Sequence, residues 1–318
     1  MSISIAESVG IGGHNNPIDV AVIQHLISKY FTQRHKVKGR STTSIKPSIP
    51  IDGVCTHDLM DLIKKIQATA LVMKSPDGRV APNGRTFREL ILQTNPAAAT
   101  AKELLFGYLA GNTGLFTKIN PQHFRKLVIK QSGLGLTITK GENLLVFFNF
   151  LQNDPDIQDI RWAAYILATV YKESEFSFKP KEENGKGGNL GYAKTQQVTD
   201  VLGCRGPKNV VYANSYYGRG YVQITHAANY KALGKAYGIG DELYINPNRA
   251  LEPKIAYFIT SYGMRHGTFT AGRHKLSTHI NDKKCDYKGA RQIINGHDKD
   301  ILIAEYANKF EILLRLSL

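Results

Sequence analysis

Residues 160–173 constrain the fold of this chain more than any other part of its sequence. They carry apolar side chains around almost the whole circumference of a helix, among them Trp162, Ile166 and Val170. A helix that is apolar on all sides is buried, so the segment predicts a central helix surrounded by other elements. Glu173 ends the segment on the stripe of these three residues, since steps of four, four and three residues keep to one face of a helix.

A carboxylate in this position is suited to acid catalysis. Burial and the negative end of the helix dipole both favour the neutral form of Glu173, which a general acid requires at neutral pH. The alternative is a last-turn glutamate that faces water or pairs with Lys172. Consecutive residues on a helix do not face each other, so we expect Lys172 to point elsewhere.

Two adjacent carboxylates, Glu182 and Glu183, follow about ten positions later in the sequence. They precede a Gly-rich segment, residues 184–189, that predicts a mobile loop. A helix-end acid opposite a loop carboxylate is the arrangement used in inverting glycoside hydrolysis, with a gap of ~6.5–9.5 Å for the attacking water. The sequence therefore predicts a hydrolase with Glu173 as the acid.

The most specific string of the chain is Tyr-Tyr-Gly-Arg-Gly-Tyr-Val-Gln-Ile-Thr at 216–225, followed by Asn229-Tyr230. Together with 163–174 and 293–296, it resembles glycoside hydrolase family 19, which comprises chitinases and related phage or bacterial lysozymes. The resemblance covers residues 156–313 and implies that Glu173 is the acid and Glu183 the base, while Thr225 helps to hold the attacking water. Lys172 replaces the family's histidine. We expect the sugar-binding residues to be Glu182, Tyr217, Gln223, Asn229 and Asn295.

Three further residues of the string have competing interpretations. Gly218 and Gly220 either let the backbone approach a ligand or serve a turn or packing contact. Arg219 is interpreted as a buried structural ion-pair partner rather than a substrate contact.

Residues 19–92 predict a small three-helix unit. Its first helix is amphipathic, residues 35–50 predict a loop, and a second helix is expected to start with Asp58 as its N-cap. Asp52-Gly53 followed by Leu-Ile-Lys-Lys-Ile-Gln at 62–67 resembles the signature of peptidoglycan-binding modules. Thr56 and Leu59 depart from that signature, while 76–80 and 84–86 are similar to the end of such modules.

The formal charge of +15 predicts an anionic partner, for which nucleic acid, anionic lipid and cell wall all qualify. Three scattered cysteines indicate neither a disulfide framework nor a zinc site, and His266, His274 and His279 lack metal-site spacing. No stretch is apolar enough to span a membrane, and no signal peptide is recognisable. We therefore expect cytoplasmic synthesis, followed by holin release or injection by a secretion machine with an immunity protein as a further partner.

These observations favour a mainly α protein with a lysozyme-like catalytic domain. We expect a peptidoglycan-binding-like domain at 1–98, a linker at 99–118 and the catalytic domain at 119–318. We expect a peptidoglycan hydrolase of the lysozyme or endolysin type that cleaves β-1,4 bonds with inversion. We further expect a monomer that needs no cofactor or metal and binds no nucleic acid. A chitinase, a lytic transglycosylase and a non-catalytic wall-binding protein are the alternatives. The sequence leaves open which bond is cut, and whether the chain is a phage endolysin or a toxin.

Overall fold

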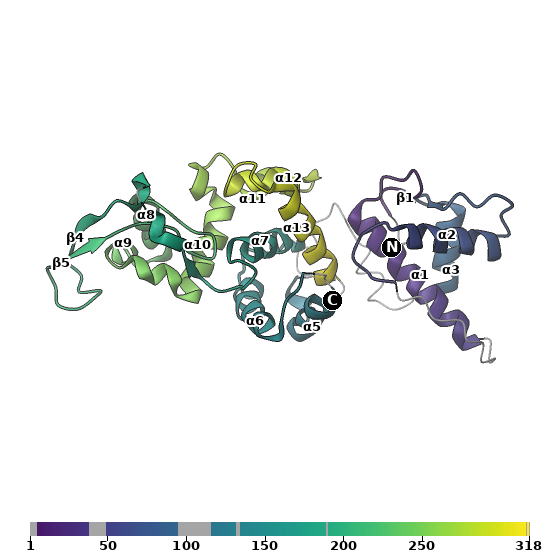
Figure 1. Ribbon diagram of the computed structural model, residues 1–318, viewed down its shortest axis with the longest axis horizontal. Coiled ribbons are helices and arrows are strands. Elements are labelled where there is room, and N and C mark those ends of the chain that lie inside the picture. The colour runs from purple at the N-terminus through teal and green to yellow at the C-terminus, as the bar shows by residue number, and fades with distance from the viewer. Residues whose placement is uncertain are drawn as a thin grey trace. The chain divides into compact units, whose positions relative to one another are not determined.

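The computed structural model describes residues 5–37, 49–94, 116–131, 134–188, 190–315 and 317 (Figure 1). Helices dominate these residues, and their strands pair only in four two-stranded antiparallel ribbons. The mainly α fold class is therefore confirmed. Within these ranges, each helix is too short or too polar to cross a lipid bilayer.

The chain divides into two compact units. The first takes its described residues from Met1–Gly135 and Asn308–Leu318, and the second from Leu136–Ala307. Most of the predicted linker, 99–118, lies outside the described residues, which resume at residue 116. The boundaries expected at 98 and 119 therefore stay predictions.

The first unit contains the three helices that the sequence predicts. A ribbon of β1 and β2 joins the segment before α1 to the segment between α2 and α3. The helices enclose a core that includes Leu26, Ile63 and Phe87. Its elements are β1 (Val9–Gly10), α1 (Pro17–Val37), α2 (His57–Thr69), β2 (Arg79–Val80), α3 (Arg85–Thr94), η1 (Phe116–Lys118), α5 (Pro121–Gln131) and the end of α13 (Asp300–Arg315).

Two buried glutamines hold the two Asp-Gly turns of this unit. Gln67, the last residue of the module-like signature, donates to Asp77 Oδ1 at 2.6 Å and accepts the N–H of Gly78 at 2.8 Å. Gln24 donates to Asp52 Oδ1 at 2.8 Å and accepts the N–H of Gly53 at 3.0 Å. Burying an amide requires that its donors and acceptors be paired, and each turn provides both kinds of partner.

Two local predictions in this unit are wrong. The N-cap of α2 is Thr56, whose Oγ1 accepts the N–H of Leu59. Asp58 lies inside the first turn, where its negative charge interacts favourably with the positive end of the helix dipole. The predicted loop at 35–50 starts too early, because α1 continues to Val37. The loss of apolar periodicity at His35 therefore does not mark the end of the helix.

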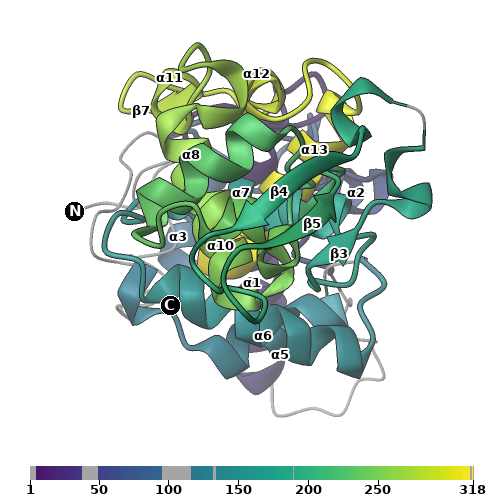
Figure 2. The same ribbon diagram turned by 90° about the vertical axis from the view of Figure 1, so that its left-hand side faces the viewer.

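The second unit is built around α7, and its strands form the ribbons β3–β6, β4–β5 and β7–β8 (Figure 2). The β4–β5 hairpin is longer than the others and was not predicted. The elements are α6 (Ile138–Gln152), α7 (Ile160–Glu173), β3 (Lys181–Glu182), η2 (Asn184–Gly187), η3 (Gly191–Ala193), β4 (Gln196–Asp200), β5 (Val210–Asn214), β6 (Arg219–Gly220), α8 (Ala227–Tyr237), α9 (Glu242–Ile245), η4 (Pro247–Leu251), α10 (Pro253–His266), η5 (Thr268–Thr270), α11 (Leu276–His279), β7 (Ile280–Asn281), β8 (Lys284–Cys285), α12 (Tyr287–Ala290), η6 (Arg291–Ile293) and the start of α13.

Helix α7 has the bounds and the burial that its sequence predicts. All its residues are buried except Trp162, Lys172 and Glu173, which are partly exposed. Asp159 caps the helix and forms an ion pair with Arg161, whose side chain is 1% exposed. Arg161 Nη1 and Trp162 Nε1 also donate to carbonyls of β7, at 3.2 and 2.9 Å. These bonds fix the start of α7, and hence the position of its last residue.

Replacing Asp159 by asparagine should destabilise the second unit. Asparagine can still cap α7, but the buried Arg161 loses its counter-charge. Breaking a buried ion pair from one side predicts a fall of about 3 kcal/mol in the free energy of unfolding. Urea denaturation followed by the fluorescence of Trp162, the single tryptophan, measures it.

Asp156→Asn is the matched control, because Asp156 pairs with Arg265 but its side chain is 59% exposed. Exposed pairs contribute less than about 1 kcal/mol. Equal losses in the two variants would contradict the role of burial.

Candidate functional site

Glu173 is held by a buried arginine at the end of α7. Its side chain is 20% exposed, and Oε1 lies 2.7 Å from Nη1 of Arg291, which is 1% exposed. Arg291 also donates from Nε to the carbonyl of Asp298 at 2.7 Å. Arg291 was not predicted as a site residue, although it lies two residues before the family-like segment 293–296. The structure thus gives the predicted acid a fixed cationic neighbour.

The buried face of α7 that leads to Glu173 is partly polar. Tyr165 and Thr169 precede Glu173 by eight and four residues, so all three lie on one stripe, and the first two are fully buried. Burial raises the pKa of the Tyr165 phenol, and its ring stacks against Tyr287. A hydroxyl-bearing stripe inside an otherwise apolar helix was readable from the sequence and was missed.

The chain directly after Glu173 turns sharply and returns beside the helix end. Glu175, Phe176 and Phe178 all adopt positive φ values between 52° and 63°, a conformation that costs non-glycine residues energy and gathers at functional sites. The Ser174 hydroxyl accepts the N–H of Phe178 at 2.9 Å and stabilises the turn. Lys172 Nζ lies over the Phe176 ring at 5.3 Å. The end of α7 is therefore a tightly constrained corner.

Glu175 connects this corner to the strand that carries the two adjacent carboxylates. It forms an ion pair with Lys181 and accepts a weak hydrogen bond from Asn184 Nδ2 at 3.5 Å. Lys181 and Asn184 flank Glu182 and Glu183 in the chain. Glu175 thus connects the helix end that carries Glu173 to the strand end that carries Glu182 and Glu183. In the described residues, no hydrogen bond or ion pair joins Glu173 directly to Glu182 or Glu183.

Glu182 and Glu183 have different partners. Glu182 is the last residue of β3 and pairs with Arg219 of β6, whereas Glu183 follows the strand. Both carboxylate oxygens of Glu183 are occupied: Oε1 accepts from Tyr192 Oη at 2.6 Å and Oε2 from the N–H of Gly218 at 2.8 Å. Glu182 accepts from Tyr217 Oη at 2.8 Å through Oε1. The hydrogen bond to Glu183 raises the pKa of Tyr192 to about 12, because a nearby carboxylate opposes ionisation of the phenol.

Arg219 has the structural role expected of it. It is 3% exposed, its guanidinium lies 3.6 Å from the centroid of the Tyr217 ring, and its Nε lies 3.7 Å from Glu182 Oε1. The two glycines beside it serve packing and turn geometry. A Cβ on Gly218 would meet Gln223 Oε1 at 2.9 Å, and Gly220 has a φ of +88°. Tyr217, only 5% exposed, therefore has one ring face covered by Arg219.

The other predicted site residues fall into two groups. Gln223 belongs to the same hairpin, since its amide donates to the carbonyls of Lys181 at 2.9 Å and Gly220 at 3.0 Å. Thr225 is half-buried, and its carbonyl accepts from Asn229 Nδ2 at 2.9 Å. The exposed Asn295 lies on the turn of Arg291, whose carbonyl accepts its N–H at 3.1 Å. Glu182, Glu183, Tyr217 and Gln223 thus form one cluster, and Asn295 lies next to the partner of Glu173.

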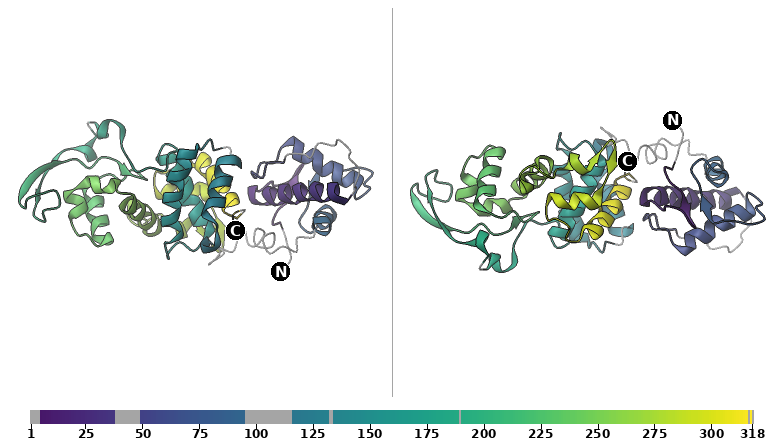
Figure 3. Two further views of the ribbon diagram at one scale, coloured as in Figure 1. Left: turned by 90° about the horizontal axis from the view of Figure 1, so that it is seen from below. Right: turned by 90° about the horizontal axis from the view of Figure 1, so that it is seen from above.

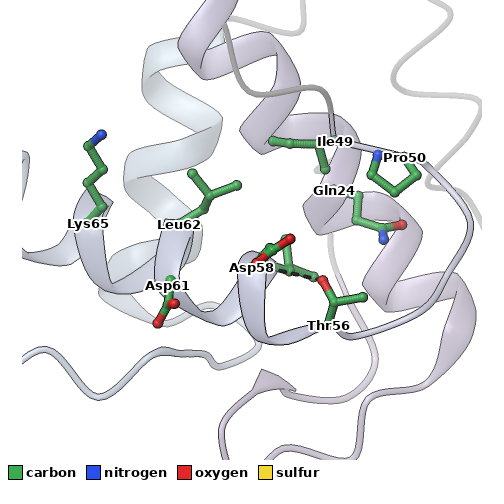
Figure 4. A pocket seen from close by; sticks show the side chains of 9 residues that line it. Gln24, Ile49, Pro50, Thr56, Asp58, Asp61, Leu62 and Lys65 are labelled. Carbon is green, nitrogen blue, oxygen red and sulfur yellow. Dashed lines mark hydrogen bonds between the residues drawn. The ribbon is translucent and has the colours of Figure 1, made fainter. Parts of the chain in front are cut away.

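A groove of about 490 Å³ opens in the first unit (Figure 4). It is bordered by Gln24 on α1, by Ile49 and Pro50, and by the first turns of α2. Thr56 and Leu59, the two departures from the module signature, both line it. Its other lining residues are Asp58, Asp61, Leu62 and Lys65. Within the described ranges, no group of three or more His, Cys, Asp or Glu residues could hold a metal ion.

No protein-family model matches the chain. A segment of 54 residues, 17% of this chain, is 39% identical to an acidic 26 kDa endochitinase of Solanum lycopersicum. The chain thus spans about a fifth, 21%, of the length of this curated relative. Among solved structures, chitinase C of Streptomyces griseus HUT6037 is 21% identical with a TM-score of 0.39, covering 64% of this chain and 95% of that one. A bacterial family 19 chitinase is 20% identical with a TM-score of 0.35, covering 61% and 94%.

The hydrogen bonds of the two carboxylates predict a selective effect on tyrosine ionisation. In Glu183→Gln, the pKa of Tyr192 should fall from about 12 toward its ordinary value of 10.0, because a neutral amide stabilises the phenol less than a carboxylate does. NMR of ¹³Cζ-labelled tyrosine, followed to about pH 11, measures it, with Tyr192→Phe assigning the signal. Glu182→Gln should leave Tyr192 unchanged, since Glu182 contacts Tyr217 instead. Equal shifts in both variants would contradict this geometry.

Proposed function

We propose that the second unit is a glycoside hydrolase that cleaves β-1,4 bonds between N-acetylated sugars with inversion. The observation that carries the proposal is the placement of Glu173 at the end of a buried helix, paired with a buried arginine. The turn after it is joined through the Glu175–Lys181 ion pair to the strand that carries Glu182. Inverting hydrolysis needs one carboxyl group that donates a proton and a second that activates water.

In this mechanism, Glu173 protonates the oxygen of the bond being cleaved. Arg291 fixes Oε1 at 2.7 Å, which leaves Oε2 to carry the proton toward the sugar. A water attacks the anomeric carbon from the opposite face and passes a proton to the base, while the leaving sugar departs with the proton from Glu173. Proton transfers of this kind contribute ~10² to 10⁴-fold each. Solvent then returns a proton to Glu173 and removes one from the base.

The geometry favours Glu182 as the base, whereas family spacing led us to expect Glu183. Each oxygen of Glu183 already accepts a hydrogen bond, one from Tyr192 and one from the backbone of Gly218, so this side chain secures the loop to β6. Glu182 uses one oxygen for Tyr217, and within the described residues its Oε2 accepts no hydrogen bond. An oxygen without a protein donor is better placed to take a proton from water.

The remaining predicted residues take supporting roles in this proposal. Thr225 helps to orient the attacking water. Among the amides, Gln223 already donates to two backbone carbonyls and Asn229 to one, so Gln223 can offer a sugar only its amide oxygen. The exposed Asn295 offers both its oxygen and its nitrogen to hydroxyl and acetamido groups. Tyr217, with one face covered by Arg219, holds Glu182 in place through its hydroxyl.

Peptidoglycan is the substrate that we propose, on the basis of charge and of the first unit. A formal charge of +15 suits the anionic surface of a bacterial wall. The first unit carries the module-like signature together with a groove beside it, which suits a wall-binding accessory unit. Holin-dependent release or injection by a secretion machine would bring the chain to that wall.

Chitin is the second candidate, because the short match is to plant endochitinases. Digestion of purified sacculi beside colloidal chitin separates the two, with mass spectrometry of the products. Hydrated reducing ends are expected from either substrate. Anhydro-sugar ends would contradict hydrolysis and indicate a lytic transglycosylase.

Glu173→Gln is expected to lower turnover by about 10³-fold or more, because an amide cannot give a proton to the leaving oxygen. Sacculus pull-down should be unchanged. Glu252→Gln is the control, since this carboxylate forms an exposed pair with Arg249, and it should keep activity within about twofold. Equal clearing of sacculi by wild type and Glu173→Gln would contradict the catalytic assignment.

Chemical rescue of the variants Glu182→Gln and Glu183→Gln identifies the base. Azide should restore turnover to Glu182→Gln and yield an inverted glycosyl azide, because a small anionic nucleophile does not need a base. Glu183→Gln should lose activity without rescue if it only secures the loop. The reverse pattern would assign the base to Glu183.

A further inference from the structure

The β4–β5 hairpin carries apolar side chains that nothing in its own unit covers. Val201 and Leu202, at the start of the connecting loop, are 56% and 49% exposed, and Val211 on β5 is 56% exposed. Val211 pairs with Thr199, which is exposed between the buried Val198 and Asp200, so both lie on the outward face of the ribbon. Figures 1 and 3 show this hairpin reaching beyond the helices of the second unit. Neighbouring exposed aliphatic groups on a projection are typical of a binding surface.

A buried carboxylate orders the loop that displays these residues. Asp200 is fully buried, and its two oxygens accept the N–H groups of Cys204 at 2.9 Å and Arg205 at 2.8 Å. The carbonyl of Asp200 accepts the N–H of Asn209 at 2.8 Å and closes the loop. Arg205 lies over the Tyr212 ring at 4.0 Å. The aliphatic side chains are therefore held outward by a pre-formed loop, and little entropy is lost when they bind.

The hairpin and the sequence on either side of it are rich in cationic residues. The acidic Asp241 and Glu242 lie in the α9 region that contacts β4, where they form ion pairs with Lys231 and Arg249. From Asn184 to Gly240 the sequence contains seven lysines and arginines and a single acidic residue, Asp200. Because Asp200 is buried and hydrogen-bonded, the exposed side chains of the hairpin carry no negative charge. Exposed Lys208 lies in the loop itself, and exposed Lys194 lies just before β4. The charge on this projection suits an anionic surface.

We propose that the β4–β5 hairpin docks onto a lipid bilayer that contains anionic phospholipid. A bilayer surface offers both features that the hairpin matches: an apolar layer for Val201 and Leu202, and negative headgroups for Lys208 and Lys194. A soluble polyanion would use the cations but not the aliphatic groups. Two weak contributions acting together give reversible binding, so the hairpin holds the second unit at the membrane surface without spanning it.

Vesicle co-sedimentation of the full chain tests this directly. Wild type should bind vesicles of phosphatidylethanolamine and phosphatidylglycerol at least tenfold better than phosphatidylcholine vesicles, and salt should weaken that binding. The double variant Val201→Ser and Leu202→Ser should lose most of the binding, and Lys208→Gln should lower it about threefold. Both changes lie on exposed positions, so a native unfolding midpoint is expected.

Ile301→Ser and Lys254→Gln form the matched control, because Ile301 is 60% exposed and Lys254 is exposed, both outside the hairpin. This control should bind as wild type does. No preference for anionic vesicles, or equal binding by the hairpin variants, would overturn the proposal. Equally tight binding of soluble polyphosphate, independent of Val201 and Leu202, would also overturn it in favour of a polyanion site. Vesicles contain no glycan, so neither result depends on the hydrolase assignment.

Discussion

The ion pair between Glu173 and Arg291 is the interaction on which the proposed chemistry depends. A guanidinium that is 1% exposed needs polar partners, and Arg291 has two besides Glu173: the carbonyl of Asp298 at 2.7 Å and the Asp298 carboxylate at 3.8 Å. Arg291 therefore keeps polar contacts when Glu173 carries the proton that the proposed reaction requires. The pair also joins the last residue of α7 to the turn that follows α12. One side chain thereby links the most buried helix of the unit to the surface segment that carries Asn295.

The two adjacent glutamates show how strand geometry can divide two tasks between equal chemical groups. Successive residues at a strand end point in different directions, so Glu182 and Glu183 meet different donors although both are carboxylates. Glu183 binds a backbone N–H across the ribbon and a phenol, which are contacts that hold a loop in place. Glu182 is held by one phenol next to a guanidinium, and in the part of the chain that the structure describes its Oε2 accepts no hydrogen bond.

The sequence predicts features that depend on local pattern and misses those that depend on distant contacts. Helix α7 was predicted with its observed bounds, because an apolar circumference is a local signal. Its capping residue, Asp159, was not predicted. Arg291 was missed because a buried arginine resembles a surface one until its partner is known. The N-cap of α2 was assigned to Asp58 because Thr and Asp two positions apart compete for the same role, and only backbone geometry decides between them. Regular spacing thus identified the elements, but not the contacts across them.

The β4–β5 hairpin escaped prediction for a different physical reason. The buried positions of its strands include the polar Asp200 and Asn214, while Val210 and Val211 are exposed, so apolar residues do not recur at the usual two-residue period. Two further interactions replace that signal: a carboxylate that caps the loop, and an arginine that stacks on Tyr212. A hairpin stabilised by its loop does not need an apolar face packed against the unit. Its aliphatic side chains are therefore available to a partner, which is why the feature hardest to read from the sequence is also the most informative exposed surface.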